Sequence, residues 1–145
     1  MSFPQPVPGL VIRYSYLWKS EHLLGQEDGV KDRPCVVILV TTDNEGEKIV
    51  TVLPISHTPP ANSALAVEIP HETKRRLGLD GERSWIVLTE AKRFVWPGPD
   101  LRLSTPGDLA NVAYGLLPRA LFKQVTAKLA DAISARLVRV VPRTE

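Results

Sequence analysis

The stretch KDRPCVVILV, residues 31–40, decides how the rest of the chain is interpreted. Three ionisable residues lead to Pro34, where we expect a turn, and six apolar residues follow from Cys35 to Val40. A run of this length, rich in β-branched side chains, predicts a strand that is buried on both faces or lies inside a small barrel. A helix is disfavoured because valine and isoleucine lose rotamer freedom there and because proline restricts the residue before it.

Arg33 lies in the charged corner that precedes this predicted strand. Its guanidinium presents a planar fork of donors that fits a phosphate or a carboxylate. The alternative is that Arg33 only pairs with Asp32 or Asp28 on a solvated rim, where ion pairs are common and contribute little to stability. This segment alone leaves both interpretations open.

The composition is that of an ordinary globular protein. A chain of 145 residues can form one domain with a hydrophobic core, and 43% hydrophobic and 23% charged residues argue against disorder. A net charge of +2 does not by itself indicate a polyanionic partner, so any basic footprint must be local. Cys35, the one cysteine, is expected to be buried and reduced. With no signal-like amino terminus and no apolar run of membrane length, we expect a cytoplasmic protein.

Short β-rich segments separated by turn signals organise the chain. A proline-rich arm is predicted for residues 1–8, a long polar loop for 19–32, a hairpin turn for 43–47 and a loop for 97–107. The predicted strands are residues 10–18, 35–40, 48–55 with an end at Pro54, 64–69, 85–90 continuing toward Phe94 and Trp96, 114–117, and an edge strand within 136–141.

Two helices are predicted. A short one over residues 70–78 ends at Gly78 and places three residues on one side, namely Ile69, Thr73 and Leu77. A longer one opens at Pro118, with an apolar residue at every fourth position: Leu121, Val125, Leu129 and Ile133. Five to seven short strands with one long late helix predict a mainly β fold with α, a small bent barrel with a helix packed on it. We expect one domain over residues 1–145, with 134–145 as an extension.

Four short motifs occur in a fixed order along the chain. They are PGLV at residues 8–11, RPCVV at 33–37, VLPIS at 52–56 and YGLLP at 114–118. In this order and spacing the chain resembles the MazF/PemK toxin family over most of residues 8–133. The resemblance implies a homodimeric SH3-like barrel that cleaves single-stranded RNA as an endoribonuclease and inhibits growth. It also implies activity without a metal or other cofactor, and a cognate antitoxin that blocks the groove.

The resemblance also assigns roles to individual residues. Arg33 stands at the family's catalytic arginine, and Ser56 stands where a catalytic threonine is usual, so that the hydroxyl is kept. Glu90 falls near the acidic position of a later strand, although the usual Asp-Gln pair is here Glu90 followed by alanine. The first-loop pattern is similar to residues 25–27, with two extra residues before Arg33. These departures leave open a catalytically silent barrel that binds nucleic acid or a partner peptide, or a regulator that uses the same groove.

Metal-free RNA cleavage requires a base, an acid and positive donors for the charge on phosphorus. Arg33 suits the role of positive donor. Ser56 either donates a hydrogen bond to a phosphate oxygen or forms a hydrogen bond with the backbone of its own turn. Histidine titrates near neutral pH, so His57 is a candidate for either proton role, the alternative being an exposed loop residue. His22 either reaches the same groove or is simply exposed.

Basic residues in the middle of the chain are interleaved with aromatic residues, a pattern that fits a single-stranded RNA groove. We assign RNA binding to Lys31, Lys92, Arg93, His22 and Trp96. The basic set is Lys74, Arg75, Arg76, Arg83, Lys92, Arg93 and Arg102, and the aromatic set is Trp85, Phe94 and Trp96. The alternative is that Trp85 and Phe94 belong to the core. The three histidines lack the spacing of a metal site, so no metal is expected.

Overall fold

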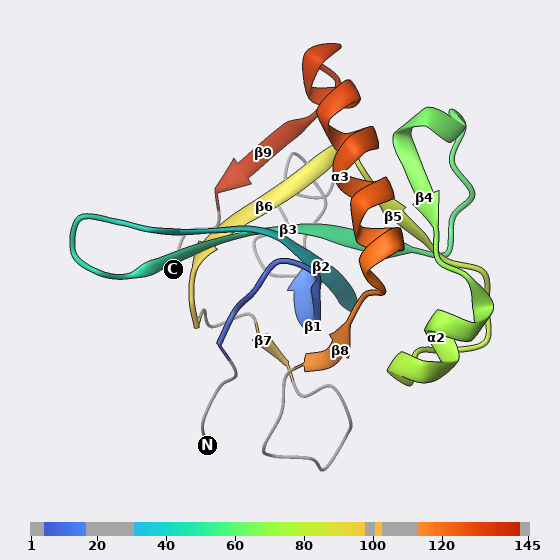
Figure 1. Ribbon diagram of the computed structural model, residues 1–145, viewed down its shortest axis with the longest axis horizontal. Coiled ribbons are helices and arrows are strands. Elements are labelled where there is room, and N and C mark those ends of the chain that lie inside the picture. Colours follow the sequence, from blue (N-terminus) through green and yellow to red (C-terminus); the bar gives the residue numbers. More distant parts are fainter. Residues whose placement is uncertain (1–4, 17–30, 98–100, 103–112, 143–145) are drawn as a thin grey trace.

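The computed structural model describes residues 5–16, 31–97, 101–102 and 113–142. In this part of the chain the elements follow the order of Figure 1. They are β1 (Leu10–Tyr16), β2 (Lys31–Thr42), β3 (Lys48–Ser56), the 3-10 turn η1 (Ser63–Leu65), β4 (Ala66–Glu68), α2 (His71–Leu77), β5 (Trp85–Val87), β6 (Glu90–Val95), β7 (Leu101–Arg102), β8 (Ala113–Leu116), α3 (Arg119–Ser134) and β9 (Arg139–Pro142). The predicted mainly β fold is confirmed.

The strands form one branched sheet in the order β4-β5-β3-β2-β1-β7, with β6 on β3, β9 on β6 and β8 on β1. All pairings are antiparallel except that of β6 with β9. The predicted closed SH3-like barrel is not confirmed, because within the described residues no pairing joins the two ends of the sheet. The physical reason is that β3 divides its length: residues 49–52 pair with β6, whereas 55–56 pair with β5.

Strand β2 is buried on both faces, as its apolar run predicts. Cys35 and Val37 pack into one core with Ile12, while Val36 packs into the core on the opposite face. Burial raises the pKa of the Cys35 thiol well above its usual range, although the charges of nearby basic residues oppose the shift, so the thiol is inert. A register shift between Val37 and Leu39 turns Leu39 outward, where it is 52% exposed.

The predicted start of this strand is wrong. The strand begins at Lys31, and Pro34 lies inside it, opposite Arg13 of β1, rather than in a turn. Likewise β3 passes through Pro54, which pairs with Cys35, and ends only at Ser56. A proline is tolerated in a strand where the ladder does not need its missing N–H group.

The other strand boundaries follow from pairing partners that the sequence does not reveal. The predicted strand at 85–90 divides into β5, which pairs with β3 and β4, and β6, which pairs with β3 and β9. Strand β4 is shorter than predicted because the 3-10 turn η1 precedes it. Strand β7 falls within the predicted loop 97–107. Strand β9 is the predicted edge strand, and its pairing with β6 was not predicted.

The helices cover the core that contains Val36. Helix α2 and its left-handed cap at Gly78 (φ 75°) are confirmed, and Ile69, Thr73 and Leu77 are all buried. Helix α3 buries Leu121, Val125, Leu129 and Ala132. The predicted Ile133 is 57% exposed, because steps of four residues drift away from a helix period of 3.6 and the stripe moves to Ala132.

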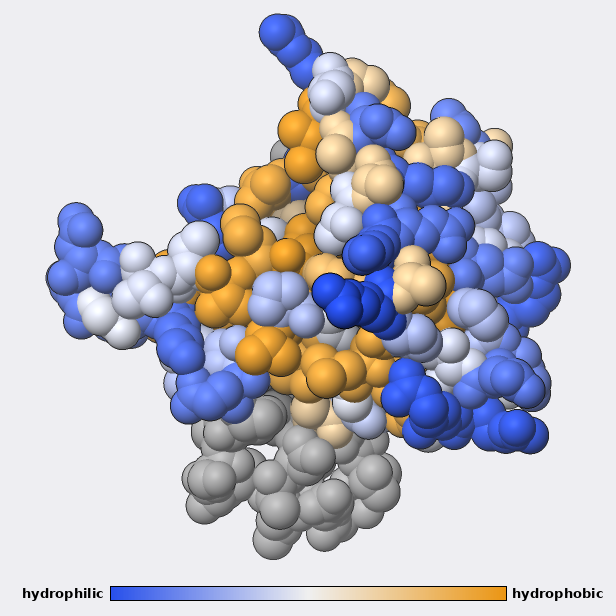
Figure 2. Space-filling model, in the orientation of Figure 1, coloured by the Kyte–Doolittle hydropathy of each residue, from blue (hydrophilic) through white to orange (hydrophobic). Residues whose placement is uncertain are grey.

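Polar and apolar surfaces are separated on the face shown in Figure 2. Hydrophobic residues gather between the β2–β3 hairpin and α3, whereas hydrophilic residues cover the hairpin tip and the region of α2. Large apolar residues exposed in the described chain include Leu116, Ile133, Leu137 and Val140. Neither described helix has the length and apolar character needed to cross a membrane.

Candidate active site

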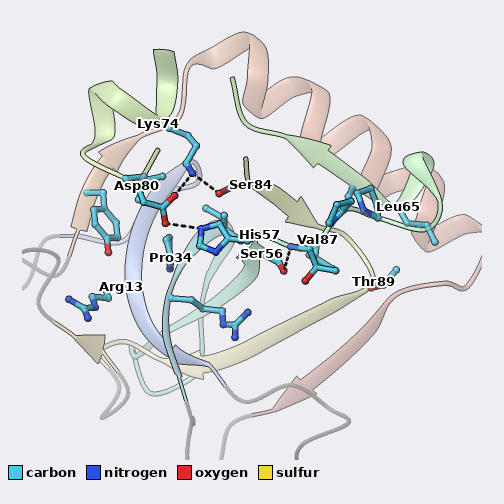
Figure 3. A pocket seen from close by; sticks show the side chains of 18 of the residues that line it. Arg13, Pro34, Ser56, His57, Leu65, Lys74, Asp80, Ser84, Val87 and Thr89 are labelled. Carbon is cyan, nitrogen blue, oxygen red and sulfur yellow. Dashed lines mark hydrogen bonds and ion pairs between the residues drawn. The ribbon is translucent and has the colours of Figure 1, made fainter. Parts of the chain in front are cut away.

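An open pocket of about 850 Å³ lies where the ends of three strands meet the segment that carries α2 (Figure 3). Strands β1 and β2 contribute Arg13, Arg33 and Pro34. Strand β3 contributes its last residue, Ser56, and His57 follows directly after it. The opposite wall comes from the end of α2, the loop after it and the segment before β4. Its lining residues include Pro60, Leu65, Lys74, Leu79, Asp80 and Ser84.

Two arginines from neighbouring strands line this pocket. In the pairing register Arg33 of β2 is opposite Tyr14 of β1, and Arg13 is opposite Pro34, so the two arginines lie one position apart on neighbouring strands. Arg33 is half-buried rather than on an open rim. Either group could bind a phosphate, because a guanidinium offers a planar fork of permanent positive charge.

Ser56 is the last residue of β3. Its Oγ accepts a hydrogen bond of 3.1 Å from the backbone N–H of Thr58, which is the local turn contact proposed for it from the sequence. That contact uses an acceptor site, so the hydroxyl proton remains available for donation. Because the strand ends here, His57 escapes the alternation of side chains along the strand, and both residues line the same pocket.

His57 is joined to the α2 segment by a hydrogen bond. Its Nε2 lies 2.7 Å from Oδ2 of Asp80, and the same nitrogen is 3.9 Å from the Glu82 carboxylate. Figure 3 shows His57 and Asp80 side by side, with Lys74 beyond them. His57 lies in the loop after β3 and its side chain is 42% exposed, as the alternative expects, but its ring is hydrogen-bonded to a carboxylate that follows α2.

Lys74 anchors that carboxylate from inside the molecule. Its side chain is 3% exposed, and Nζ donates to Asp80 Oδ1 at 2.7 Å, to Ser84 Oγ at 2.6 Å and to the backbone carbonyl of Glu82. Partial burial acts to raise the pKa of Asp80, but the hydrogen bonds from Lys74, the Glu82 N–H and His57 outweigh it and hold the pKa below its usual value. Asp80 is thus a carboxylate at neutral pH.

A metal ion has one possible set of ligands among the described residues. One ligand atom each from His57, Asp80 and Glu82 lie within 4.8 Å of one another, on exposed side chains. However, the ammonium of Lys74 already occupies one oxygen of Asp80 and places a positive charge beside the set. The arrangement is more typical of an ion-paired hydrogen-bond network than of a cation site.

The predicted residues on and after β6 do not line this pocket. Glu90 is 8% exposed and begins β6, opposite Arg139 of β9. Lys92 is 1% exposed, which corrects its predicted place on a surface groove, because alternation along β6 turns its side chain inward. Arg93 is exposed and Trp96 is half-buried beside Phe94. His22 and the side chain of Lys31 lie outside the described residues, as do residues 25–27.

Most of the predicted basic and aromatic set has a structural explanation. Trp85 and Phe94 are buried, as the core interpretation predicts. Arg83 forms two hydrogen bonds with Glu68 and lies 5.0 Å from the ring of Trp85. Lys74, expected on the surface, is instead a buried residue of the pocket wall. The basic residues between positions 74 and 83 are therefore not one continuous RNA-binding surface.

Two residues of the site, Arg13 and Asp80, were not predicted from the sequence, and Lys74 was predicted only as a surface residue. Arg13 lies in the first strand with no motif around it, and only the pairing register connects it with Arg33. Asp80 follows α2 in an Asp-Gly turn and lies 23 residues from His57 in the chain, so nothing local connects the two. The sequence does contain an indication that Lys74 is buried, because it lies next to Thr73 and before Leu77 on a short helix that must bury one side.

Comparison with known proteins identifies the family. A family model described as a PemK-like, MazF-like toxin of type II toxin-antitoxin systems matches residues 20–95, just over half of the chain. Among curated proteins, no relative matches the chain. The matched segment contains Arg33, Ser56, His57, Lys74 and Asp80. The chain belongs to the PemK-like, MazF-like toxin family of type II toxin–antitoxin systems.

Proposed function

We propose that this toxin is a metal-independent endoribonuclease that cleaves single-stranded RNA in the pocket between β2, β3 and the α2 segment. The observation that carries the proposal is that Arg33, Ser56 and His57 line one open cavity, in a family of RNA-cleaving toxins. A cavity of about 850 Å³ has room for one unstacked nucleotide with its phosphate.

The chemistry needs only side chains of this protein and water. His57 takes the proton of the 2′-hydroxyl, the 2′-oxygen forms a bond to phosphorus, and the bond from phosphorus to the 5′-oxygen breaks. The 5′-oxygen gains a proton from water, and the imidazolium gives its proton back to solvent. Arg33 stabilises the extra negative charge on the phosphate oxygens, and Ser56 donates one hydrogen bond. The products end in a 2′,3′-cyclic phosphate and a 5′-hydroxyl.

The test is cleavage of unstructured RNA in the presence of a chelator. Arg33→Ala should lower kcat/KM by about 10³-fold, because a charge-stabilising donor in the transition state is lost. Arg119→Ala is the matched control, since Arg119 is an exposed arginine on α3 and does not line the pocket. RNA left intact by the wild-type protein, or cut equally well by Arg33→Ala, would overturn the proposal.

The same assay separates the second candidate, a catalytically silent protein that binds nucleic acid or a partner peptide. The burial of Glu90 away from the pocket favours this candidate, because it removes the acidic residue that the family resemblance offers. Binding of RNA with steep salt dependence but without cleavage would support the silent candidate. Arg93 and Trp96 remain predicted contacts for nucleotides that flank the cleaved one.

Membership in a type II family implies an antitoxin partner. We expect the antitoxin to block the pocket, so added antitoxin should abolish cleavage and compete with RNA. We also expect a homodimer, which the exposed Ile133, Leu137 and Val140 support as apolar surface that a second copy would cover. Light scattering after size exclusion measures the mass, and a value of one chain at micromolar concentration would contradict the dimer.

A further inference from the structure

A chain of polar contacts leads from the protein interior to the pocket. Its first member is the ammonium of Lys74, held by Ser84 Oγ and the Glu82 carbonyl. Its second is the carboxylate of Asp80, with Oδ1 on Lys74 and Oδ2 on His57, each at 2.7 Å. The last member is the imidazole of His57, which lines the pocket. One carboxylate therefore bridges a buried, fully hydrogen-bonded cation and a candidate proton carrier (Figure 3).

The bridge determines which nitrogen of His57 carries the proton. A carboxylate only accepts hydrogen bonds, so Asp80 requires a proton on Nε2 of the neutral imidazole. The lone pair is then on Nδ1, the nitrogen that does not contact Asp80. When Nδ1 takes a second proton, the imidazolium that forms lies against the negative charge of Asp80, which stabilises it.

We propose that Asp80, fixed by Lys74, is the positioning residue that holds His57 as a base with Nδ1 available to the substrate. This inference rests on the proposed function, and it gives the α2 segment a role in catalysis. Asp80 acts through His57 and does not contact the reacting atoms. Glu82 does not share the role, since its carboxylate is 3.9 Å from Nε2, beyond hydrogen-bond distance.

The variant Asp80→Asn gives a prediction specific to this arrangement. Lysine has only donors, so the buried Lys74 ammonium must be satisfied by the amide oxygen of the introduced asparagine. The amide NH₂ then faces Nε2 of His57, and Nε2 must accept, so the proton moves to Nδ1 and the base is lost. Asp80→Ala, in contrast, removes the partner and leaves the imidazole free to choose either tautomer. The amide variant should therefore be more damaging than the smaller alanine variant.

The first experiment measures RNA cleavage at saturating and limiting RNA concentrations. Asp80→Asn should lower kcat by about 100-fold with KM unchanged, a loss of the size that general acid–base catalysis supplies. Asp80→Ala should lower kcat by only about 10-fold, because part of the imidazole keeps the active tautomer. Glu82→Gln is the matched control and should cleave as the wild type does. In a His57→Gln background, Asp80→Asn should have no additional effect, because its influence passes through His57.

The second experiment does not depend on activity. Nitrogen-15 chemical shifts of the His57 ring, recorded at about pH 8.5 where imidazoles are neutral, identify the protonated nitrogen. The wild type should show a proton on Nε2 and Asp80→Asn a proton on Nδ1. Combining Asp80→Asn with Lys74→Met allows the introduced amide to turn over, and this double change should return the proton to Nε2.

Different results would overturn different claims. An Nδ1 proton in the wild type, or an unchanged tautomer in Asp80→Asn, would overturn the positioning role even if the protein cleaves RNA. Equal losses for Asp80→Asn in the presence and absence of His57 would also overturn it. A wild-type protein that shows the expected tautomer but leaves RNA intact would overturn the proposed function and, with it, the catalytic meaning of the bridge.

Discussion

Two pairs of opposite charges lie within residues 68–84, and they differ most in the burial of the basic partner. Lys74 and Asp80 are 2.7 Å apart, and the lysine side chain is 3% exposed although that of Asp80 is 49% exposed. Arg83 and Glu68 make two hydrogen bonds of 2.8 and 2.9 Å, but their side chains are 72% and 41% exposed. By geometry alone the second pair is the better one, because a guanidinium holds a carboxylate with two parallel hydrogen bonds.

The comparison shows that burial of one partner matters more than ideal geometry. Water screens the exposed pair, and both of its side chains lose rotamer freedom to form it. In the other pair the lysine is buried, so loss of any of its hydrogen-bond acceptors would leave a buried charge without compensation. The carboxylate that it binds is therefore held in one position. Only this pair continues to a third group, His57, in the pocket.

The largest effect is expected for Lys74→Ala. This change removes three hydrogen bonds, deprives the buried Ser84 of a partner and leaves a small cavity, so it should lower the free energy of unfolding by about 3 kcal/mol. Urea denaturation should show a lower midpoint with an unchanged m-value. Arg75→Ala, the exposed neighbour on the same helix, is the control and should unfold as the wild type does. Equal midpoints for the two variants would mean that Lys74 is not the anchor.

A smaller effect is expected in acid. The pKa of Asp80 is lower in the folded protein than its ordinary value of 3.8, so the folded state binds fewer protons in this range. The stability that Asp80 contributes is therefore complete above about pH 4 and is lost as the pH falls through the lower folded pKa. Asp80→Asn should flatten the dependence of the unfolding free energy on pH below this point. If the unfolding free energy of the variant changed with pH as steeply as that of the wild type, the Asp80 carboxylate would not contribute to stability.

Many features of the fold depend on residues that are close together in the sequence. The apolar run after Pro34, the turn at 43–47 and the cap at Gly78 each depend on neighbours in sequence, and each is present where predicted. Pairing partners are different, because they are chosen over long distances. Nothing local shows that β3 divides between β5 and β6, so the sequence predicts a closed barrel where the described sheet is branched.

The site residues also separate into those that local sequence predicts and those that depend on long-range contacts. Arg33, Ser56 and His57 could be predicted, because motifs surround the first two and the third is adjacent to Ser56. Asp80 could not, since a lone aspartate in an Asp-Gly turn reads as an ordinary turn residue. Lys92 was misplaced because sequence shows charge but not which face of a strand a residue occupies, and burial next to an apolar core is rare for lysine.

The smallest effect is expected for the exposed pair. Glu68→Gln should leave both the unfolding midpoint and RNA cleavage as they are in the wild type, because solvent screens the pair and neither residue lines the pocket. The hydrogen bond from Arg83 lowers the pKa of Glu68, yet both groups remain in water, so this shift has little influence on folding. Urea denaturation and RNA cleavage, measured side by side for Glu68→Gln and Asp80→Asn, compare the two charge pairs directly. If Glu68→Gln changed either quantity as much as Asp80→Asn does, burial would not be what separates a functional charge pair from a solvated one in this protein.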